Sequence, residues 1–139
     1  MQHETAPMSL ASYRLEKAMS LLRDAQLLFN AGQLASANNR AYYALFHGIR
    51  AVLALQQKDF KKHSAAIAAF NQDYIHTGLF DRAYITVINH ASIIRNHSDY
   101  DDFYICSQEE TAELLQDVAK FLVAVSAYLG EQGCRQPDC

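Results

Sequence analysis

Hydrophobic residues recur every three or four positions along most of the chain, which is the spacing of one face of an α-helix. This spacing predicts five helical segments, over about residues 9–30, 33–57, 64–74, 80–97 and 107–130. Four of them are long and amphipathic, and short connections join them. Such helices can bury their hydrophobic stripes only against one another. The pattern therefore predicts an all-α fold: an up-and-down four-helix bundle with a short additional helix.

Capping signals mark the ends of several predicted helices. Ser107 and Glu110 have the spacing of a capping box, in which two side chains satisfy free backbone N–H groups at a helix start. Ser64 has the position of an N-cap for the short helix. Gly32 follows the first helix as a stop. These signals support the predicted boundaries.

The chain reads as one domain with two short ends. No repeat, low-complexity segment or linker interrupts residues 9–130, so we predict a single helical bundle over that range. We expect residues 1–8 to be a disordered N-terminus and residues 131–139 to be a flexible tail. The start lacks a secretory leader, and no apolar run reaches the ~18 residues of a membrane span. We therefore expect a cytoplasmic protein.

The composition supports this interpretation. The 139 residues include five glycines and two prolines, too few for a fold of many short strands. Half of the residues are hydrophobic and the formal net charge is −3. These values exclude a disordered chain and a uniformly basic nucleic-acid coat, but they allow a local basic patch. Cys106, Cys134 and Cys139 form no C-x-x-C pair and indicate free thiols, with a Cys134–Cys139 bridge as the alternative.

The second predicted helix carries an unusual polar strip. Arg40, Tyr43, His47 and Arg50 follow the spacing i, i+3, i+7 and i+10, which places them on one face, opposite Leu45 and its apolar neighbours. A solvated face is one interpretation. The other is a site for RNA or a nucleotide, because guanidinium, imidazole and phenol groups suit phosphates and bases.

Two further segments could contribute to such a site. Arg95 shares a helix face with apolar residues and needs a partner, which Asp99, one turn later, could supply. This pair is either structural or holds the arginine for a phosphate. Before the short helix, His63 and Ser64 follow two lysines, where a helix start favours an anion; a solvated loop is the alternative.

We expect neither a metal nor a cofactor. A di-metal bundle needs Glu-x-x-His pairs from separate helices, and the sequence contains none. The histidines and aspartates between His90 and Asp102 do not have that spacing. Glycine-rich phosphate loops and hydrolase motifs are also absent from the sequence.

Several segments, in order and spacing, resemble one family. The run from Asn39 to Leu53 resembles the second helix of HEPN-domain proteins (higher eukaryotes and prokaryotes nucleotide-binding), and is most similar to small prokaryotic members with a YYAxFHxxRAxL signature. The short helix, which opens with Lys62-His63-Ser64 and closes before Thr77-Gly78-Leu79, agrees with it. So does Arg95-x-x-x-Asp99-Tyr100. The resemblance covers about residues 10–130.

The resemblance implies a homodimer with the polar ends of the second and fourth helices at its interface. Many HEPN proteins are metal-independent RNases in toxin–antitoxin or phage-defence systems, and others only bind RNA or nucleotides. Small members are often paired with a minimal nucleotidyltransferase, an antitoxin that modifies a tyrosine, for which Tyr100 and Tyr104 are candidates. Arg95 matches the nuclease-motif arginine.

The nuclease motif itself is not intact. The family's histidine would fall at positions 100–102, which hold Tyr100, Asp101 and Asp102, whereas His97 is only two residues from Arg95. The candidate catalytic residues are therefore Arg95, His97, Asp99 and Tyr100. The sequence leaves two functions open: an RNA- or nucleotide-binding RNase toxin, and a non-catalytic helical module that docks a partner protein.

Overall fold

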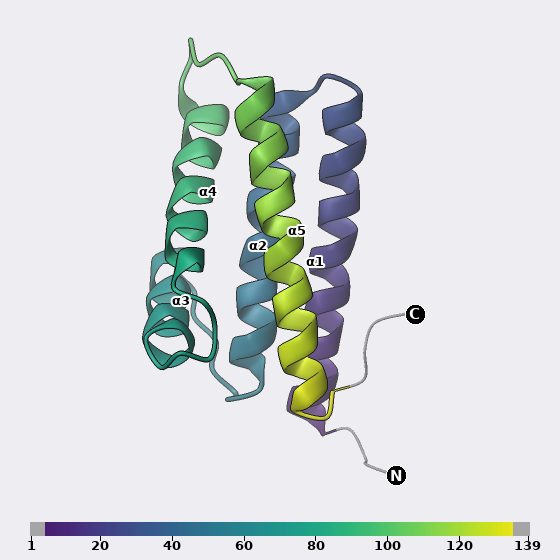
Figure 1. Cartoon of the computed structure of the whole chain (residues 1–139), viewed down its shortest axis with the longest axis vertical. Helices are drawn as coiled ribbons and strands as arrows, with labels where there is room; N and C mark the ends of the chain where they lie inside the picture. Colours follow the sequence, from purple (N-terminus) through teal and green to yellow (C-terminus); the bar gives the residue numbers. More distant parts are fainter. Residues whose placement is uncertain (1–4, 135–139) are drawn as a thin grey trace.

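Two long antiparallel helices, α1 and α2, begin a bundle that runs up and down along one axis (Figure 1). The computed structural model describes residues 5–134, and every regular element in that range is helical. The elements are α1 (Ala6–Asn30), α2 (Leu34–Ala54), α3 (His63–Phe70), a π-helical turn η1 (Asn71–Ile75), α4 (Ala83–Tyr100) and α5 (Gln108–Glu131). The prediction of a four-helix bundle with a short extra helix is confirmed.

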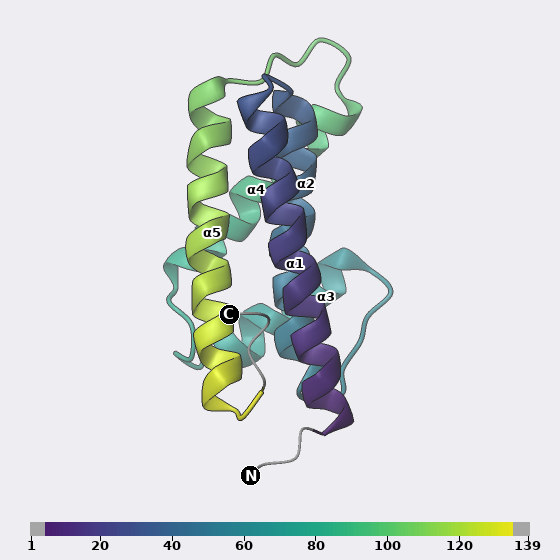
Figure 2. The same cartoon turned by 90° about the vertical axis from the view of Figure 1, so that its right-hand side faces the viewer.

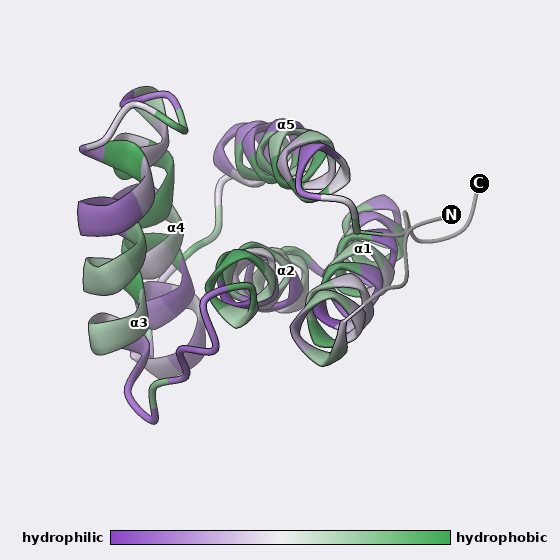
Figure 3. Cartoon of the chain, turned by 90° about the horizontal axis from the view of Figure 1, so that it is seen from below, coloured by the Kyte–Doolittle hydropathy of each residue, from purple (hydrophilic) through white to green (hydrophobic). Residues whose placement is uncertain are grey.

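The helix α2 is the centre of the fold. It contacts α1, α3, α4 and α5, while α1 and α4 do not meet. In the end-on view, α2 lies between α1 and the layer that α3 and α4 form (Figure 3). Gly48 allows α5 to come close, because a Cβ atom there would lie 2.7 Å from Leu122 Cδ2 and 3.3 Å from Phe121 Cε2. Both faces of α2 are therefore positioned by neighbouring helices.

The first helix begins earlier than the hydrophobic pattern predicted. Thr5 is its N-cap, and the Thr5 hydroxyl accepts a hydrogen bond from the backbone N–H of Met8. Pro7 in the first turn already has a helical φ. Residues 6–8, which we expected to be disordered, are therefore helical. Residues 1–4 lie outside the described part of the chain.

The end of the chain is also more ordered than expected as far as it is described. The helix α5 continues to Glu131, and the N–H of Cys134 donates to the carbonyl of Leu129. Cys134 is buried against the core. The flexible tail predicted for residues 131–139 therefore does not include residues 131–134, while Cys139 and the rest of that tail lie outside the described residues. Figure 2 shows the start of α1 and the end of α5 at the same pole of the bundle.

The starts of α5, α3 and α4 differ in their capping contacts from those predicted from the sequence. Ser107 accepts from the N–H of Glu110, which is one half of the predicted capping box. The helix α3 begins at His63 with Lys62 as N-cap and no side-chain cap, so the prediction that Ser64 caps it is wrong. The ring of His63 packs on Phe46 of α2, which fixes the first turn one residue earlier. Asp81 accepts from the N–H of Ala83, where α4 begins.

Candidate functional site

The side chain of Arg95 is held in place by three residues. Its Nε donates to Asp99 Oδ2 at 3.0 Å, its Nη1 donates to Asn96 Oδ1 at 3.3 Å, and its Nη2 donates to Tyr43 Oη at 2.7 Å. Only 16% of the side chain is exposed. Because Asp99 lies one turn further along α4 and Tyr43 lies on α2, the guanidinium is fixed from two helices. The predicted Arg95–Asp99 pair is present.

Aromatic rings surround the same guanidinium. Its Cζ atom lies 5.1 Å from the ring centre of Tyr42, 5.3 Å from that of Tyr43 and 5.5 Å from that of Tyr100. At these distances a ring attracts a cation. Burial opposes the charge, but the tyrosines and Asp99 outweigh it and raise the pKa of Arg95. The group stays positively charged and oriented.

Asp99 connects the arginine to the start of α2. Its Oδ2 atom accepts from Asn39 Nδ2 at 2.8 Å as well as from Arg95, and Asn39 Oδ1 accepts from Arg40 Nη1 at 2.7 Å. Arg40 is exposed. A second link between the two helices runs from Asn38 Nδ2 to Ser98 Oγ at 3.0 Å. The N-terminal part of α2 and the C-terminal part of α4 thus form one polar surface.

His63 brings a base to this surface from α3. Its Nδ1 atom lies 3.1 Å from Tyr42 Oη, and its ring meets that of Tyr43 edge-on at 5.8 Å. Burial, and then the positive charges of Arg95 and Arg50, lower the pKa of His63. The ring is therefore neutral near pH 7, and in the tautomer whose Nδ1–H donates to Tyr42 Oη the Nε2 atom can accept a proton. His63 shares two tyrosines with Arg95.

The polar strip predicted on α2 is divided between two places. Tyr43 and Arg40 belong to the polar surface around Arg95, which we call the Arg95 surface. Arg50 lies two turns further along α2 and pairs with Asp59 at 3.3 Å. His47 lies with Arg50, and its Nδ1 atom is buried without a hydrogen-bond partner among residues 5–134. Burial, and then nearby cations, lower the pKa of His47 to about 4. This imidazole stays neutral and is separate from Arg95.

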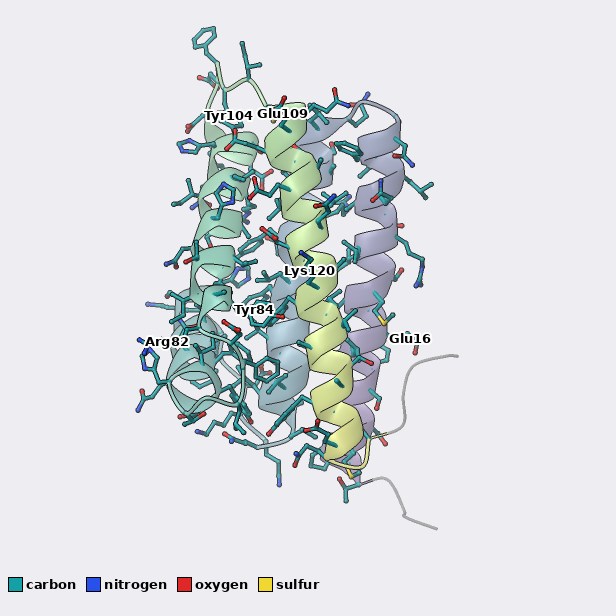
Figure 4. The ribbon with its side chains drawn as sticks, in the orientation of Figure 1. Glu16, Arg82, Tyr84, Tyr104, Glu109 and Lys120 are labelled. Carbon is teal, nitrogen blue, oxygen red and sulfur yellow. The ribbon has the colours of Figure 1, made fainter. Side chains whose placement is uncertain are left out.

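His97 and Tyr104 form a third group, at the end of α4. His97 Nδ1 is hydrogen-bonded to Asp101, and the His97 ring stacks on that of Tyr104 at 5.2 Å. Two residues along a helix correspond to a rotation of about 200°, so His97 and Arg95 leave α4 in nearly opposite directions. Tyr104 lies at the pole of the bundle where α4 ends and α5 begins (Figure 4). The structure does not place His97 with Arg95.

Two residues that were not among those predicted from the sequence complete the Arg95 surface and the Arg50–Asp59 pair. Tyr42 contacts both Arg95 and His63, but the hydrophobic pattern gave it no special role. Arg14 of α1 is almost fully buried and donates to the carbonyl of Arg50 and to Asp59. A signal for Arg14 existed, because a charged residue there interrupts an otherwise apolar stripe.

The sequence as a whole is similar to one family of proteins. A family model described as the HEPN domain matches residues 11–128. The chain belongs to the HEPN family. A UPF0332 protein of Thermotoga maritima is 32% identical over 84% of this chain and 88% of its own length. A protein of Methanocaldococcus jannaschii named "Putative toxin MJ0142" is 31% identical over 83% of this chain and 78% of its own length.

The absence of the nuclease-motif histidine can now be compared with the positions of the histidines in the structure. Positions 100–102 hold no histidine, and the histidine that shares its aromatic neighbours with Arg95 is His63, which comes from α3. Ser64 lies exposed in the first turn of the same helix. Within residues 5–134, no three metal-ligating side chains gather at one place, and no helix is long and apolar enough to cross a membrane.

Proposed function

We propose that this HEPN protein is a homodimeric RNA-binding toxin that cleaves RNA without a metal, in a toxin–antitoxin or defence setting. The observation that carries the proposal is Arg95, fixed by Asp99 and Tyr43 beside a histidine that is neutral near pH 7. A positioned cation and a positioned base are the groups that metal-free cleavage of RNA requires. The toxin name of its relatives supports the same class.

The geometry suggests a role for each group. His63 accepts the proton of the ribose 2′-hydroxyl, whose oxygen attacks the adjacent phosphate. Arg95 stabilises the negative charge that develops on the phosphate oxygens. The hydroxyl of Tyr100 is a candidate donor to the leaving 5′-oxygen, because Tyr100 packs against Arg95 and is 69% exposed. In a dimer, the partner copy would supply a second set of these groups.

The test is RNA cleavage in the presence of a chelator. We expect the wild-type protein to cleave, and the variants Arg95→Gln and His63→Gln to lose about 100-fold or more in rate. His97→Gln is the matched control, because that histidine lies outside the Arg95 surface. A wild-type protein that neither cleaves RNA nor binds it in a salt-dependent way would refute the proposal.

A second function is favoured by a different observation. The loop between α4 and α5 lies at one pole of the bundle (Figure 1). It exposes apolar side chains: Phe103 is 96% exposed and Ile105 is 89% exposed. Exposed apolar residues that lie close together commonly mark protein contacts. We therefore also propose, as the alternative, a non-catalytic module that docks a partner, such as a nucleotidyltransferase, through this loop.

Pull-down experiments separate the two functions. If the loop docks a nucleotidyltransferase, Phe103→Ser should lose the partner and Arg95→Gln should retain it. Intact mass after co-expression then reports nucleotide addition. Tyr100 is more exposed than Tyr104, whose ring stacks on His97, so Tyr100→Phe should remove more of the added mass than Tyr104→Phe. Absence of both capture and added mass would reject the docking function for this partner.

A further inference from the structure

Tyr42 is the buried neighbour of His63. Only 3% of Tyr42 is exposed, and its Oη atom lies 3.1 Å from His63 Nδ1. The two rings stack with their centres 5.9 Å apart. Because a hydroxyl so far from solvent must donate its proton to a neighbouring group, the direction of the bond to His63 depends on what else Tyr42 contacts.

Ser92 of α4 is the second partner of Tyr42. The hydroxyl groups of the two residues are hydrogen-bonded to each other. The Ser92 hydroxyl also lies one turn after Ile88 and donates to the Ile88 carbonyl oxygen at 3.0 Å. A carbonyl oxygen can only accept, so the single proton of Ser92 is directed at Ile88. The lone pairs of Ser92 Oγ therefore remain available to accept from Tyr42.

These contacts give the chain of hydrogen bonds one direction. The Tyr42 hydroxyl donates to Ser92 Oγ, because the proton of Ser92 points to Ile88. The oxygen of Tyr42 then accepts from His63, which carries its hydrogen on Nδ1. The Nε2 atom of His63 is left with a free lone pair. The chain connects α3 to α2 and α2 to α4.

Nε2 is the nitrogen that the proposed cleavage requires. A general base must present a lone pair to the proton that it accepts. In the other tautomer of His63, Nε2 would carry the hydrogen and the lone pair of Nδ1 would face the buried hydroxyl of Tyr42. Which nitrogen of a neutral imidazole is protonated is set by the hydrogen bond that the ring makes. Here that bond is made by Tyr42.

We infer that Tyr42 and Ser92 are positioning residues of the proposed RNase, and that together with the backbone of Ile88 they hold His63 in the tautomer whose Nε2 atom is free. The inference rests on the proposed function for its effect on catalysis, whereas the tautomer is a property of the protein alone. Tyr42 acts through His63 and need not touch RNA, because it is buried.

Nitrogen NMR spectra of the whole chain report the tautomer directly. Protonated and unprotonated ring nitrogens of histidine have well-separated ¹⁵N shifts, and His63→Gln identifies the signals of this residue. At about pH 8 the ring is neutral, since burial and nearby cations lower the pKa of His63. We expect the hydrogen on Nδ1 and none on Nε2. A wild-type spectrum with the hydrogen on Nε2 would overturn the inference.

Ser92→Ala is the decisive variant. It removes the acceptor for the Tyr42 proton, so the Tyr42 hydroxyl turns and donates to His63 Nδ1, and the hydrogen of His63 moves to Nε2. We expect the ¹⁵N spectrum to show this change. We also expect kcat for RNA cleavage to fall about tenfold with KM unchanged, because Ser92 acts on the base and not on RNA binding. Ser92→Thr retains a hydroxyl and should restore both the tautomer and kcat.

Tyr42→Phe tests the middle of the chain. It keeps the buried ring but offers no hydroxyl to His63 Nδ1, so we expect signals of both tautomers and a lower kcat. Thr77→Ala is the matched control, because the Thr77 hydroxyl also donates to the carbonyl four residues earlier, at Asp73, but it is exposed and outside this chain of hydrogen bonds. It should behave as wild type.

The outcomes separate this inference from the proposed function. If the wild type does not cleave RNA, but His63 carries its hydrogen on Nδ1 and moves it in Ser92→Ala, the RNase proposal fails and the assigned tautomer stands. If the wild type cleaves RNA and Ser92→Ala keeps the wild-type tautomer and kcat, the inference fails and the RNase proposal stands. A slower Ser92→Ala with an unchanged tautomer would make Ser92 a structural residue and would also overturn the inference.

Discussion

Arg95 Nη2 donates a 2.7 Å hydrogen bond to Tyr43 Oη, and this bond joins α4 to α2. The two residues are 52 positions apart in the chain. Each entered the sequence analysis for a different reason, Tyr43 as part of a polar strip and Arg95 as a buried charge. The packing of α4 on α2 makes them one unit, so the orientation of the guanidinium depends on a tyrosine hydroxyl from another helix.

Removing that hydroxyl should reduce RNA cleavage without removing the aromatic contact. The variant Tyr43→Phe keeps a ring 5.3 Å from the arginine but cannot accept from Nη2. We expect kcat/KM for RNA to fall about tenfold, because one charged hydrogen bond no longer fixes the guanidinium. Tyr13→Phe, at an exposed position of α1, is the control and should behave as wild type. Unchanged cleavage by Tyr43→Phe would show that the bond does not position Arg95.

Asp99 should contribute to stability as well as to the site. It accepts from both Arg95 and Asn39, and only 21% of its side chain is exposed. The variant Asp99→Asn leaves a partly buried guanidinium without its carboxylate, so we expect the free energy of unfolding to fall by about 1–2 kcal/mol. Urea denaturation measures this. Asp102→Asn, in the exposed loop after α4, is the control and should change little.

The capping contact at the start of α5 should be measurable in the same way. Ser107 Oγ accepts from the N–H of Glu110, and Ser107→Ala removes this acceptor. We expect a loss of about 1 kcal/mol in the free energy of unfolding. Ser107→Asp should retain wild-type stability, since a carboxylate also caps the N–H group and suits the helix dipole. Equal stability of all three proteins would mean that water replaces the cap.

The fold could be predicted from the sequence because its determinants are local. Four apolar stripes of helical period can be buried in few ways. Gly32, in the connection between α1 and α2, has a positive φ of 79°, as expected for a glycine that follows the end of a helix. Boundaries were harder to predict, because Thr5 and Asp81 start helices outside the apolar stripes. The contact between Arg95 and Asp99 was predictable as well, since i and i+4 positions share a helix face.

The candidate site was only partly predictable, because it depends on packing between helices. A helical wheel places Tyr43 and Arg50 on one face, but α3 packs beside that face and inserts His63 near Phe46. The strip is therefore divided between the Arg95 surface and the pair that Arg50 forms with Asp59. Arg14 approaches Arg50 across 36 positions of the chain. No periodicity within a single helix reports such a contact.

The environment of His47 links protein stability to pH. The side chain is partly buried, and its Nδ1 atom has no partner within the described residues. Burial is the largest cause of its low pKa, and the positive charges of Lys17, Arg50 and Arg14, together with His63 once it is protonated, lower the pKa further. A proton on this imidazole would be an additional cation among these groups. The folded protein therefore disfavours protonation of His47.

Stability should fall as the pH decreases from about 6.5 to about 4. The pKa of His47 is about 4 in the folded protein against an ordinary value of 6.5, so between these values the unfolded chain binds a proton that the folded protein does not. The free energy of unfolding should decrease over this window by at most about 3 kcal/mol, with His63 adding to the same trend. The variant His47→Gln should flatten much of this slope in urea denaturation, whereas His76→Gln, an exposed histidine, should retain it. An unchanged slope in His47→Gln would show that this histidine is not the titrating group.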